Sequence, residues 1–223
     1  MCAQDFRLLT FDCYGTLIDW ESGIRSALER LVGALPSRLD PEAMFQAYLR
    51  NEAAVQAGPF RSYAQVLQET AVAVGAESGL HDSPRLRRCL LDSLPGWQPF
   101  PDTVPALRRL AARYRLGILS NVDRSLLAAT LRWLPVSFDL IVTAEDVRSY
   151  KPAPGHFRAM LARVGCPPNR VLHVAQSLFH DIAPCQRLGI ACAWINRRGE
   201  RRSADYRPDM QFDDLERVGD RLL

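Results

Sequence analysis

The chain has 223 residues, of which 48% are hydrophobic and 24% charged, which excludes a disordered protein and favours one sizeable core with room for a smaller insertion. The formal net charge of +3 is small, so nothing in the overall charge calls for a nucleic acid or a membrane surface as partner. The six cysteines show no Cys-x-x-Cys pair or zinc spacing, and we see neither a signal peptide nor a bilayer-spanning apolar stretch, so we expect a cytoplasmic protein with reduced thiols.

The first predicted strand ends at Asp12. Residues 6–11 form an apolar run typical of a buried strand, and Gly15 predicts a tight turn after it. A carboxylate at the carboxyl end of the first strand of an α/β sheet points into the crevice where such sheets bind ligands. The alternative is an Asp that only caps a turn. Cys13 follows directly, but strand alternation turns its side chain away from the crevice.

Residues 19–97 predict a helical cap inserted after this strand. Helical patterns without an intervening strand occupy 21–33, 41–56, 62–74 and 83–93. Pro41 and Pro84 fit first-turn positions of two of these helices. A helical lid over a crevice suits a reaction that must exclude water.

From residue 98 onward, strand and helix patterns alternate. The predicted strands are 116–119, 139–142, 171–174 and 191–195, and the predicted helices are 103–113, 124–133, 155–164 and 180–188. This rhythm predicts an α/β fold with a doubly wound, parallel, five-stranded sheet, formed by residues 1–18 and 98–223. The basic cluster at 197–202 lacks interleaved aromatic residues, so we interpret it as a solvated loop and expect no nucleic-acid partner.

Polar residues follow three of the later strands. Ser120 and Asn121 end the second strand, where they can donate hydrogen bonds to an anion or cap the next helix. Lys151 follows the third strand and can pair with the first-strand carboxylate, although a lone lysine is usually solvated. Asp181 follows the fourth strand and can orient a water, hold Lys151 or complete a helix N-terminus. Its neighbour His180 is interpreted as a structural or surface histidine rather than a base.

The order Asp12, Ser120, Lys151, Asp181 resembles the haloacid dehalogenase (HAD) superfamily of hydrolases. That superfamily carries an Asp nucleophile, a Ser or Thr, a Lys and a late acidic motif in this order. The resemblance covers essentially the whole chain, including the position of the cap. Four segments look most like the L-2-haloacid dehalogenase branch: 12–17, 119–121, 150–152 and 194–197.

Two positions depart from the magnesium phosphatases that make up most of the superfamily. Tyr14 stands where those enzymes carry an acid that protonates the leaving alkoxide, and a halide needs no such proton. Gln176 stands where they carry an Asp that holds magnesium, and a neutral amide is a weak ligand for this ion. The resemblance therefore implies a 2-haloacid dehalogenase that uses no metal or other cofactor and takes a small anionic substrate.

The resemblance also implies roles for the site residues. Asp12 attacks the carbon that bears the halogen, and a water oriented by Asp181 hydrolyses the resulting ester. Asn121 and a cap arginine bind the halide, with Arg50 preferred over Arg61. The implied catalytic residues are Asp12, Thr16, Ser120, Lys151 and Asp181; the implied substrate-binding residues are Tyr14, Arg50, Phe60 (as an apolar wall), Arg61, Asn121, Gln176 and Ser177.

Other positions depart from the dehalogenase branch. That branch carries a Tyr where this chain has Phe157, which we interpret as a core residue, and a Ser and an Asn where Gln176 and Leu178 stand. A substrate other than a small haloacid therefore stays open. The alternatives are a HAD phosphatase with weak magnesium dependence, using Asp12 and Asp181, and a HAD-like binding protein without catalysis. The oligomeric state is also open, a homodimer being one option.

Overall fold

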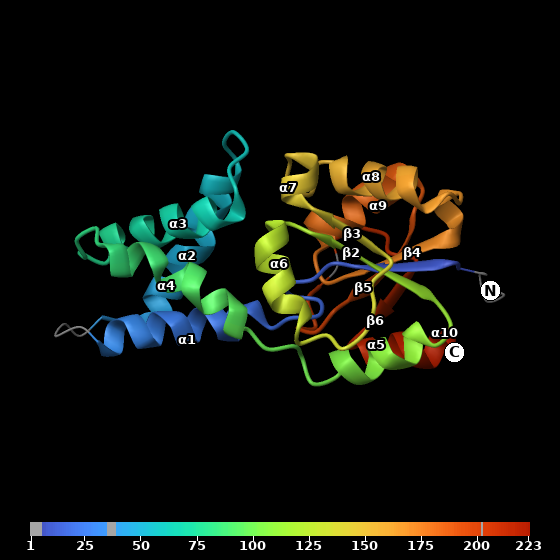
Figure 1. Cartoon of the computed structure of the whole chain (residues 1–223), viewed down its shortest axis with the longest axis horizontal. Helices are drawn as coiled ribbons and strands as arrows, with labels where there is room; N and C mark the ends of the chain where they lie inside the picture. Colours follow the sequence, from blue (N-terminus) through green and yellow to red (C-terminus); the bar gives the residue numbers. More distant parts are fainter. Residues whose placement is uncertain (1–5, 35–38, 202) are drawn as a thin grey trace. The chain divides into compact units, whose positions relative to one another are not determined.

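The computed structural model describes residues 6–34, 39–201 and 203–223, which form two compact units (Figure 1). The α/β unit comprises the chain up to Ile18, Pro99–Asn121 and Leu131–Leu223, and the helical unit comprises Asp19–Gln98 and Val122–Thr130. The predicted division into a core (1–18 and 98–223) and a cap (19–97) stays a proposal. The contacts within the structure group residues 122–130 with the helical unit. Cys2, one of the six cysteines, and Arg202, the last residue of the basic cluster, lie outside the described residues.

A six-stranded parallel sheet is the centre of the α/β unit, in the order β3-β2-β1-β4-β5-β6. Its strands are β1 (Leu8–Phe11), β2 (Arg115–Ser120), β3 (Leu140–Thr143), β4 (Val171–Ala175), β5 (Ala191–Ile195) and β6 (Met210–Phe212). β1 is buried along its whole length, as expected for a parallel strand covered on both faces. The predicted doubly wound parallel sheet is confirmed, but the predicted number of five strands is wrong, because β6 pairs with β5 as a sixth.

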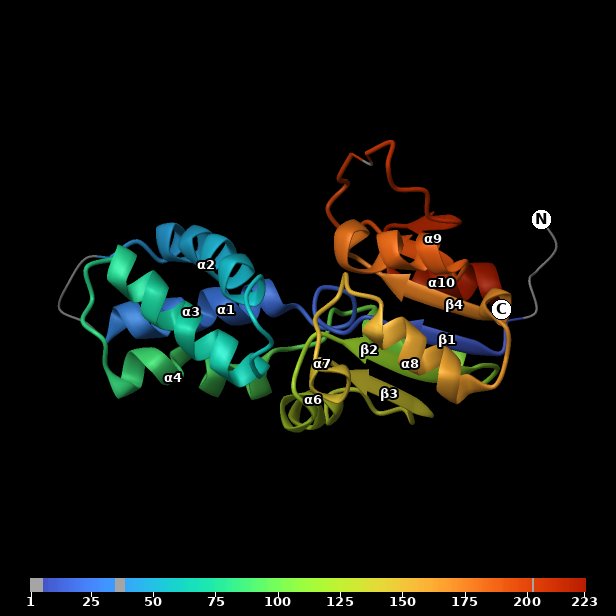
Figure 2. The ribbon, with the colours of Figure 1, turned by 90° about the horizontal axis from the view of Figure 1, so that it is seen from above.

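Helices cover both faces of this sheet (Figure 1; Figure 2). One face carries α7 (Ala144–Val147), α8 (Gly155–Val164) and α9 (Ala183–Leu188), and the other carries α5 (Thr103–Ala111) and α10 (Leu215–Leu222). Two short turns complete the unit, the 3-10 turn η2 (Pro168–Arg170) and the π-helical turn η3 (Leu178–Ile182). Phe157 on α8 is fully buried in the core beside Trp194, which confirms its interpretation as a core residue.

The strand order reverses its winding direction between β1 and β4. The chain winds to one side of β1 through β2 and β3, and to the other side through β4, β5 and β6. Ligands of doubly wound sheets bind where the winding direction reverses. Asp12 follows β1, Ser120 ends β2, and Asp181 follows β4. The topology therefore brings three of the predicted site residues to one edge of the sheet.

The helical unit contains α1 (Trp20–Gly33), α2 (Pro41–Gln56), α3 (Tyr63–Glu77), α4 (Pro84–Ser93), the 3-10 turn η1 (Leu94–Gly96) and most of α6 (Arg124–Leu131). Pro41 and Pro84 occupy the first turns of α2 and α4, as predicted. Asp123, just before α6, accepts hydrogen bonds of 2.8 Å from the backbone N–H groups of Tyr63 and Ala64. These bonds attach the α6 segment to the start of α3. None of the described helices combines the length and apolar character needed to cross a bilayer.

Candidate active site

Asp12 lies at the point where β1 ends and the chain turns back. Gly15 has a φ of 98°, a region that favours glycine, and its N–H donates to the carbonyl of Ile18 at 2.8 Å, so the predicted tight turn is present. The turn returns the hydroxyl of Thr16 to Asp12, where it donates to Oδ2 at 2.8 Å. Thr16 Oγ1 also accepts from the backbone N–H of Gln176 at 2.9 Å, which ties the turn to the end of β4.

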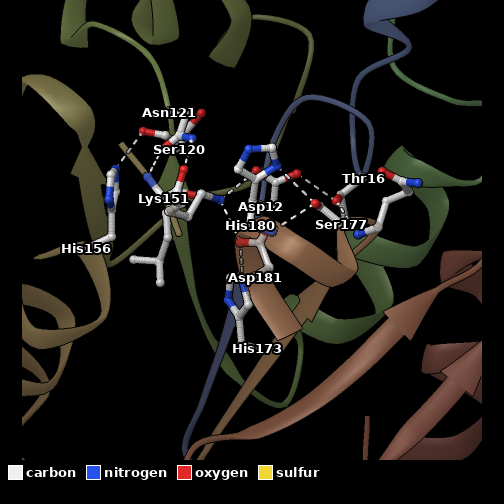
Figure 3. Close-up of polar contacts among 12 residues, drawn as sticks. Asp12, Thr16, Ser120, Asn121, Lys151, His156, His173, Ser177, His180 and Asp181 are labelled. Carbon is white, nitrogen blue, oxygen red and sulfur yellow. Dashed lines mark hydrogen bonds and ion pairs between the residues drawn. The ribbon is translucent and has the colours of Figure 1, made fainter. Parts of the chain in front are cut away.

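Lys151 joins the two carboxylates of the site (Figure 3). Its Nζ donates to Asp12 Oδ1 at 2.8 Å, to Asp181 Oδ1 at 2.7 Å and to the carbonyl of Leu119 at 2.8 Å. These three bonds use all the ammonium hydrogens, and the residue is only 2% exposed. The contact expected between Lys151 and Asp12 is confirmed.

The charges of this cluster stabilise one another. Burial alone would lower the pKa of Lys151, but the carboxylates of Asp12 and Asp181 outweigh burial and raise that pKa above its usual value. Burial would raise the pKa of Asp181, yet the Lys151 ammonium and the hydrogen bond from His173 hold it below its usual range. Lys151 and Asp181 therefore stay ionised together.

His173 and Thr10 extend this cluster into the sheet. They are register partners on β4 and β1, and both are fully buried. His173 Nε2 lies 2.9 Å from Asp181 Oδ1, and Nδ1 lies 2.9 Å from Thr10 Oγ1. The sequence patterns singled out neither residue. The available signal was a polar residue inside each of two apolar strands, because a polar group buried between apolar neighbours needs a partner.

Ser120 presents a hydroxyl without a partner. Its Oγ is buried and makes no hydrogen bond within the described residues. Its backbone carbonyl accepts a hydrogen bond of 3.1 Å from Nε2 of His156, a second buried histidine that the sequence patterns missed. Burial and the charge of Lys151 lower the pKa of His156 to about 4, so this ring is neutral at neutral pH. Buried hydroxyls are rarely unsatisfied, and an oxygen of a bound molecule would satisfy this one.

Asn121 fixes the backbone of Lys151. Its Oδ1 accepts from the Lys151 N–H at 2.7 Å, and its Nδ2 donates to the Lys151 carbonyl at 3.1 Å. One amide hydrogen of Asn121 remains to donate to an anion. Its halide-binding role stays a prediction.

The segment after β4 arranges its side chains in two directions. Gln176 places its amide 3.5 Å from Glu200 Oε1. Ser177 Oγ accepts from the His180 backbone N–H at 3.0 Å and lies 3.0 Å from His180 Nδ1. Burial lowers the pKa of His180 below its usual value. The Lys151 charge lowers this pKa further, whereas the charges of Asp181 and Asp12 oppose the shift. The ring projects toward the Asp12 side of the cluster and is partly buried (Figure 3). The interpretation of His180 as a structural or surface histidine rather than a base stays a prediction.

The remaining predicted residues are distributed over both units. Tyr14 lies half-buried in the turn after β1, and its backbone forms a β-bridge with Ile18. Arg50 on α2 pairs with Glu77 at 2.9 Å. Phe60 is half-buried just before α3. Arg61 lies 3.3 Å from Glu69 and donates to the carbonyl of Val55 at 3.2 Å. The contacts expected between these four residues and a substrate stay predictions.

Arg197 holds the turn after β1 through a hydrogen bond to its backbone. The prediction that this residue belongs to a solvated loop was wrong. Its side chain is only 14% exposed and forms a double hydrogen bond with Asp102 at 3.0 and 2.9 Å. It also donates to the carbonyl of Thr16 at 2.9 Å, and its guanidinium stacks 3.9 Å from the ring centre of Phe100. The paired geometry of arginine suits such a support. The sequence pattern did not predict these contacts, because Arg197 begins a run of charged residues that is typical of an exposed loop.

Comparisons with known proteins identify the family of the chain. The haloacid dehalogenase-like hydrolase profile matches residues 6–189. The chain is 26% identical over 199 residues to an (S)-2-haloacid dehalogenase of Pseudomonas putida, covering 85% of this chain and 84% of the relative. It is 31% identical over 126 residues to the pyrophosphatase PpaX of Bacillus velezensis, covering 54% and 55%. A crystal structure of a defluorinating L-2-haloacid dehalogenase matches with a TM-score of 0.83 at 26% identity, covering 97% of this chain and 95% of the other.

Proposed function

The chain belongs to the haloacid dehalogenase-like hydrolases, and within this family we propose that it is a 2-haloacid dehalogenase. The observation that carries the proposal is the buried cluster in which Lys151 binds Asp12 at 2.8 Å and Asp181 at 2.7 Å. Such a cluster holds a carboxylate oriented for attack on carbon. The similarity to an (S)-2-haloacid dehalogenase over most of both chains supports the same reaction. A cytoplasmic location and a homodimer stay predictions.

In the first half-reaction, Asp12 displaces the halide. A carboxylate oxygen of Asp12 forms a bond to the carbon that bears the halogen, and the carbon–halogen bond breaks with its electron pair going to the halide. Thr16 and Lys151 keep the carboxylate in one orientation, which lowers the entropic part of the barrier. The halide leaves without a proton, so the reaction does not need an acid at Tyr14.

In the second half-reaction, water attacks the carbonyl carbon of the Asp12 ester. The bond between that carbon and the ester oxygen breaks, and this oxygen, which came from Asp12, leaves on the product hydroxy acid. The water oxygen stays on Asp12, one proton of the water ends on the hydroxy acid, and the other reaches solvent. Asp181 orients the water, while the unpartnered hydroxyl of Ser120 binds a substrate oxygen. Both groups lie at the same edge of the sheet as Asp12.

The residues present do not fit the magnesium ion that other members of this superfamily use. The Lys151 ammonium already binds an oxygen of Asp12 and of Asp181, and a second cation beside it would be repelled. Gln176 is neutral, and its amide lies toward Glu200. Within the described residues, no group of three or more His, Cys, Asp or Glu side chains could hold a metal ion. Neither half-reaction is therefore assigned a magnesium ion.

The runner-up is a phosphatase, which the similarity to a pyrophosphatase over about half of the chain favours. Phosphate monoesters carry two negative charges, which Asp12 would repel without a screening cation, and their alkoxide needs an acid to leave. Tyr14 is a weak substitute for that acid because phenols titrate near pH 10. The site therefore supports halide displacement better than phosphate transfer.

The test compares halide release from 2-chloropropionate with phosphate release from p-nitrophenyl phosphate. Each substrate is measured with excess magnesium and with EDTA. We expect stereoselective halide release that persists in EDTA, because Lys151 supplies the positive charge of the site. Magnesium-dependent phosphate release that EDTA abolishes, with no halide release, would replace the dehalogenase proposal with the runner-up.

A further inference from the structure

A buried line of hydrogen bonds runs from β1 through β4 to Asp181. Thr10, His173 and Asp181 are at most 1% exposed. Thr10 Oγ1 lies 2.9 Å from His173 Nδ1. His173 Nε2 lies 2.9 Å from Asp181 Oδ1 (Figure 3). The rings of Phe157 and His173 pack edge to face, with their centroids 5.1 Å apart and an interplanar angle of 83°, which holds the His173 ring in place. The proposed chemistry uses neither Thr10 nor His173.

The direction of each hydrogen bond follows from the chemistry of the groups. Asp181 is an ionised carboxylate beside Lys151, so it can only accept, and Nε2 of His173 must carry the proton. In a neutral ring Nδ1 is then an acceptor, and the hydroxyl of Thr10 donates to it. Thr10 thereby selects the tautomer in which His173 donates to Asp181.

Two donors converge on one oxygen of Asp181. Lys151 Nζ and His173 Nε2 both bind Oδ1, at 2.7 and 2.9 Å. The Lys151 ammonium is shared among three acceptors, whereas Nε2 of His173 bonds Asp181 alone, from a planar ring on a strand of the sheet. With Oδ1 occupied, Oδ2 is the oxygen available to a water.

We infer that His173 is the positioning residue that keeps Oδ2 of Asp181 directed at the hydrolytic water, with Thr10 fixing its tautomer. The inference rests on the proposed function, because the water acts on the Asp12 ester. It assigns His173 to the second half-reaction only. The Asp12–Lys151 pair, which governs halide displacement, keeps its own contacts without His173.

The first test replaces His173 with Phe, which keeps an apolar ring in β4 but removes the donor. Halide release in the first turnover should stay within a few-fold of the unchanged protein, while kcat falls by about 10²-fold. Because the Asp12 ester would then accumulate, kcat and KM should fall together and kcat/KM should hold. Mass spectrometry should find the substrate mass on the peptide that contains Asp12. The acid limb of kcat should move to higher pH, because the lost hydrogen bond had lowered the pKa of Asp181.

Two further variants separate positioning from a structural role. His173→Gln offers an amide that can donate to Asp181 and accept from Thr10, so it should recover part of kcat. Thr10→Val removes only the hydroxyl and should show a smaller form of the same ester accumulation. Its matched control is Thr70→Val in the helical unit, since the Thr70 hydroxyl is equally buried but makes no hydrogen bond within the described residues. Thr70→Val should leave all rates unchanged.

The outcomes distinguish this inference from the proposed function. If His173→Phe lowers kcat and kcat/KM equally without ester accumulation, His173 does not act in the second half-reaction. If His173→Phe fails to fold, Thr10→Val decides in the same way. If the unchanged protein releases no halide even in one turnover, the proposed function fails, and the assignment of His173 to the second half-reaction fails with it. The 15N NMR spectrum of His173 tests the inferred tautomer independently of turnover. A ring protonated at Nδ1 would overturn it.

Discussion

Asp12 accepts one hydrogen bond on each carboxylate oxygen, from Lys151 and from Thr16. An amide at this position keeps the shape but loses the charge and the nucleophilicity, so Asp12→Asn should lower turnover by about 10⁴-fold or more. The measurement is halide release with mass spectrometry of the same sample, because an Asn that deamidates restores Asp. Activity that survives in a sample without deamidation would remove Asp12 from the role of nucleophile.

The hydroxyl of Ser120 is buried without a partner within the described residues, and such a group costs about 1–3 kcal/mol of stability. Ser120→Ala should therefore raise Tm by a few degrees while raising KM for a haloacid. Ser177→Ala is the matched control, because its hydroxyl is already bonded to His180 and its loss should lower Tm. A lower Tm for Ser120→Ala would show that the hydroxyl has a partner in solution, such as water.

The residues that could be predicted from the sequence are those with a charge at the end of a strand pattern. Asp12 ends an apolar run, and Lys151 and Asp181 lie in the loops that follow later strand patterns. This placement, together with the resemblance to the HAD superfamily, predicted that they meet. Thr10 and His173 lie inside such runs, where the pattern gives them no direction. Their partnership depends on the register of β1 against β4, two strands separated by most of the chain.

Glu52 on α2 gives the helical unit its own dependence on pH. Burial raises the pKa of Glu52 from 4.5 to about 7, although hydrogen bonds from Gln56 and Tyr63 oppose the rise. Between these values the folded unit binds a proton that the unfolded chain has lost, so the free energy of unfolding falls as pH rises. Glu52→Gln should therefore stabilise the protein at pH 8 by about 1–2 kcal/mol and by much less at pH 4. The gain at pH 8 is smaller than the full pKa shift implies, because solvent reaches the partly buried side chain and screens its charge.

Denaturant unfolding at both pH values tests this expectation. The control is Glu29→Gln on α1, an exposed position whose replacement should change stability equally little at both pH values. An equal change in the free energy of unfolding at pH 4 and pH 8 would contradict the prediction, because it would mean that the Glu52 carboxyl has the same pKa in the folded and unfolded chains.

Elements differed in how well their patterns predicted them. The long cap helices follow clear apolar periodicity and proline signals, and α2 has the predicted bounds of 41 and 56. β6 has three partly exposed residues and only one neighbouring strand, so its apolar pattern is too short to recognise. α10 spans eight residues and is mostly polar, and it was missed for the same reason. The turn η3 reads as an ordinary helix start, because a π-helical turn has no sequence signature of its own.

The whole molecule folds from pieces that are far apart in sequence. β1 pairs with β2 and β4, so Leu8 lies opposite Arg115 and Val171, whereas the first four helices contact one another locally. Pairing of strands that are more than about a hundred residues apart in sequence is slow, because the long connecting segment must be brought together first. In pulse-labelling hydrogen exchange during refolding, amides of α1–α4 should become protected before those of β1. Simultaneous protection would mean that the two units fold as one.

Lys151 is the only lysine of the chain, and the structure encloses it. Amine-directed reagents and modifying enzymes need an accessible, unprotonated ε-amine, and the folded α/β unit offers none in this chain. Acylation of Lys151 would therefore record only molecules in which this site has opened. The mass of the peptide that contains Lys151 then reports how often that opening occurs, and a molecule acylated there has lost the cation that joins its two carboxylates.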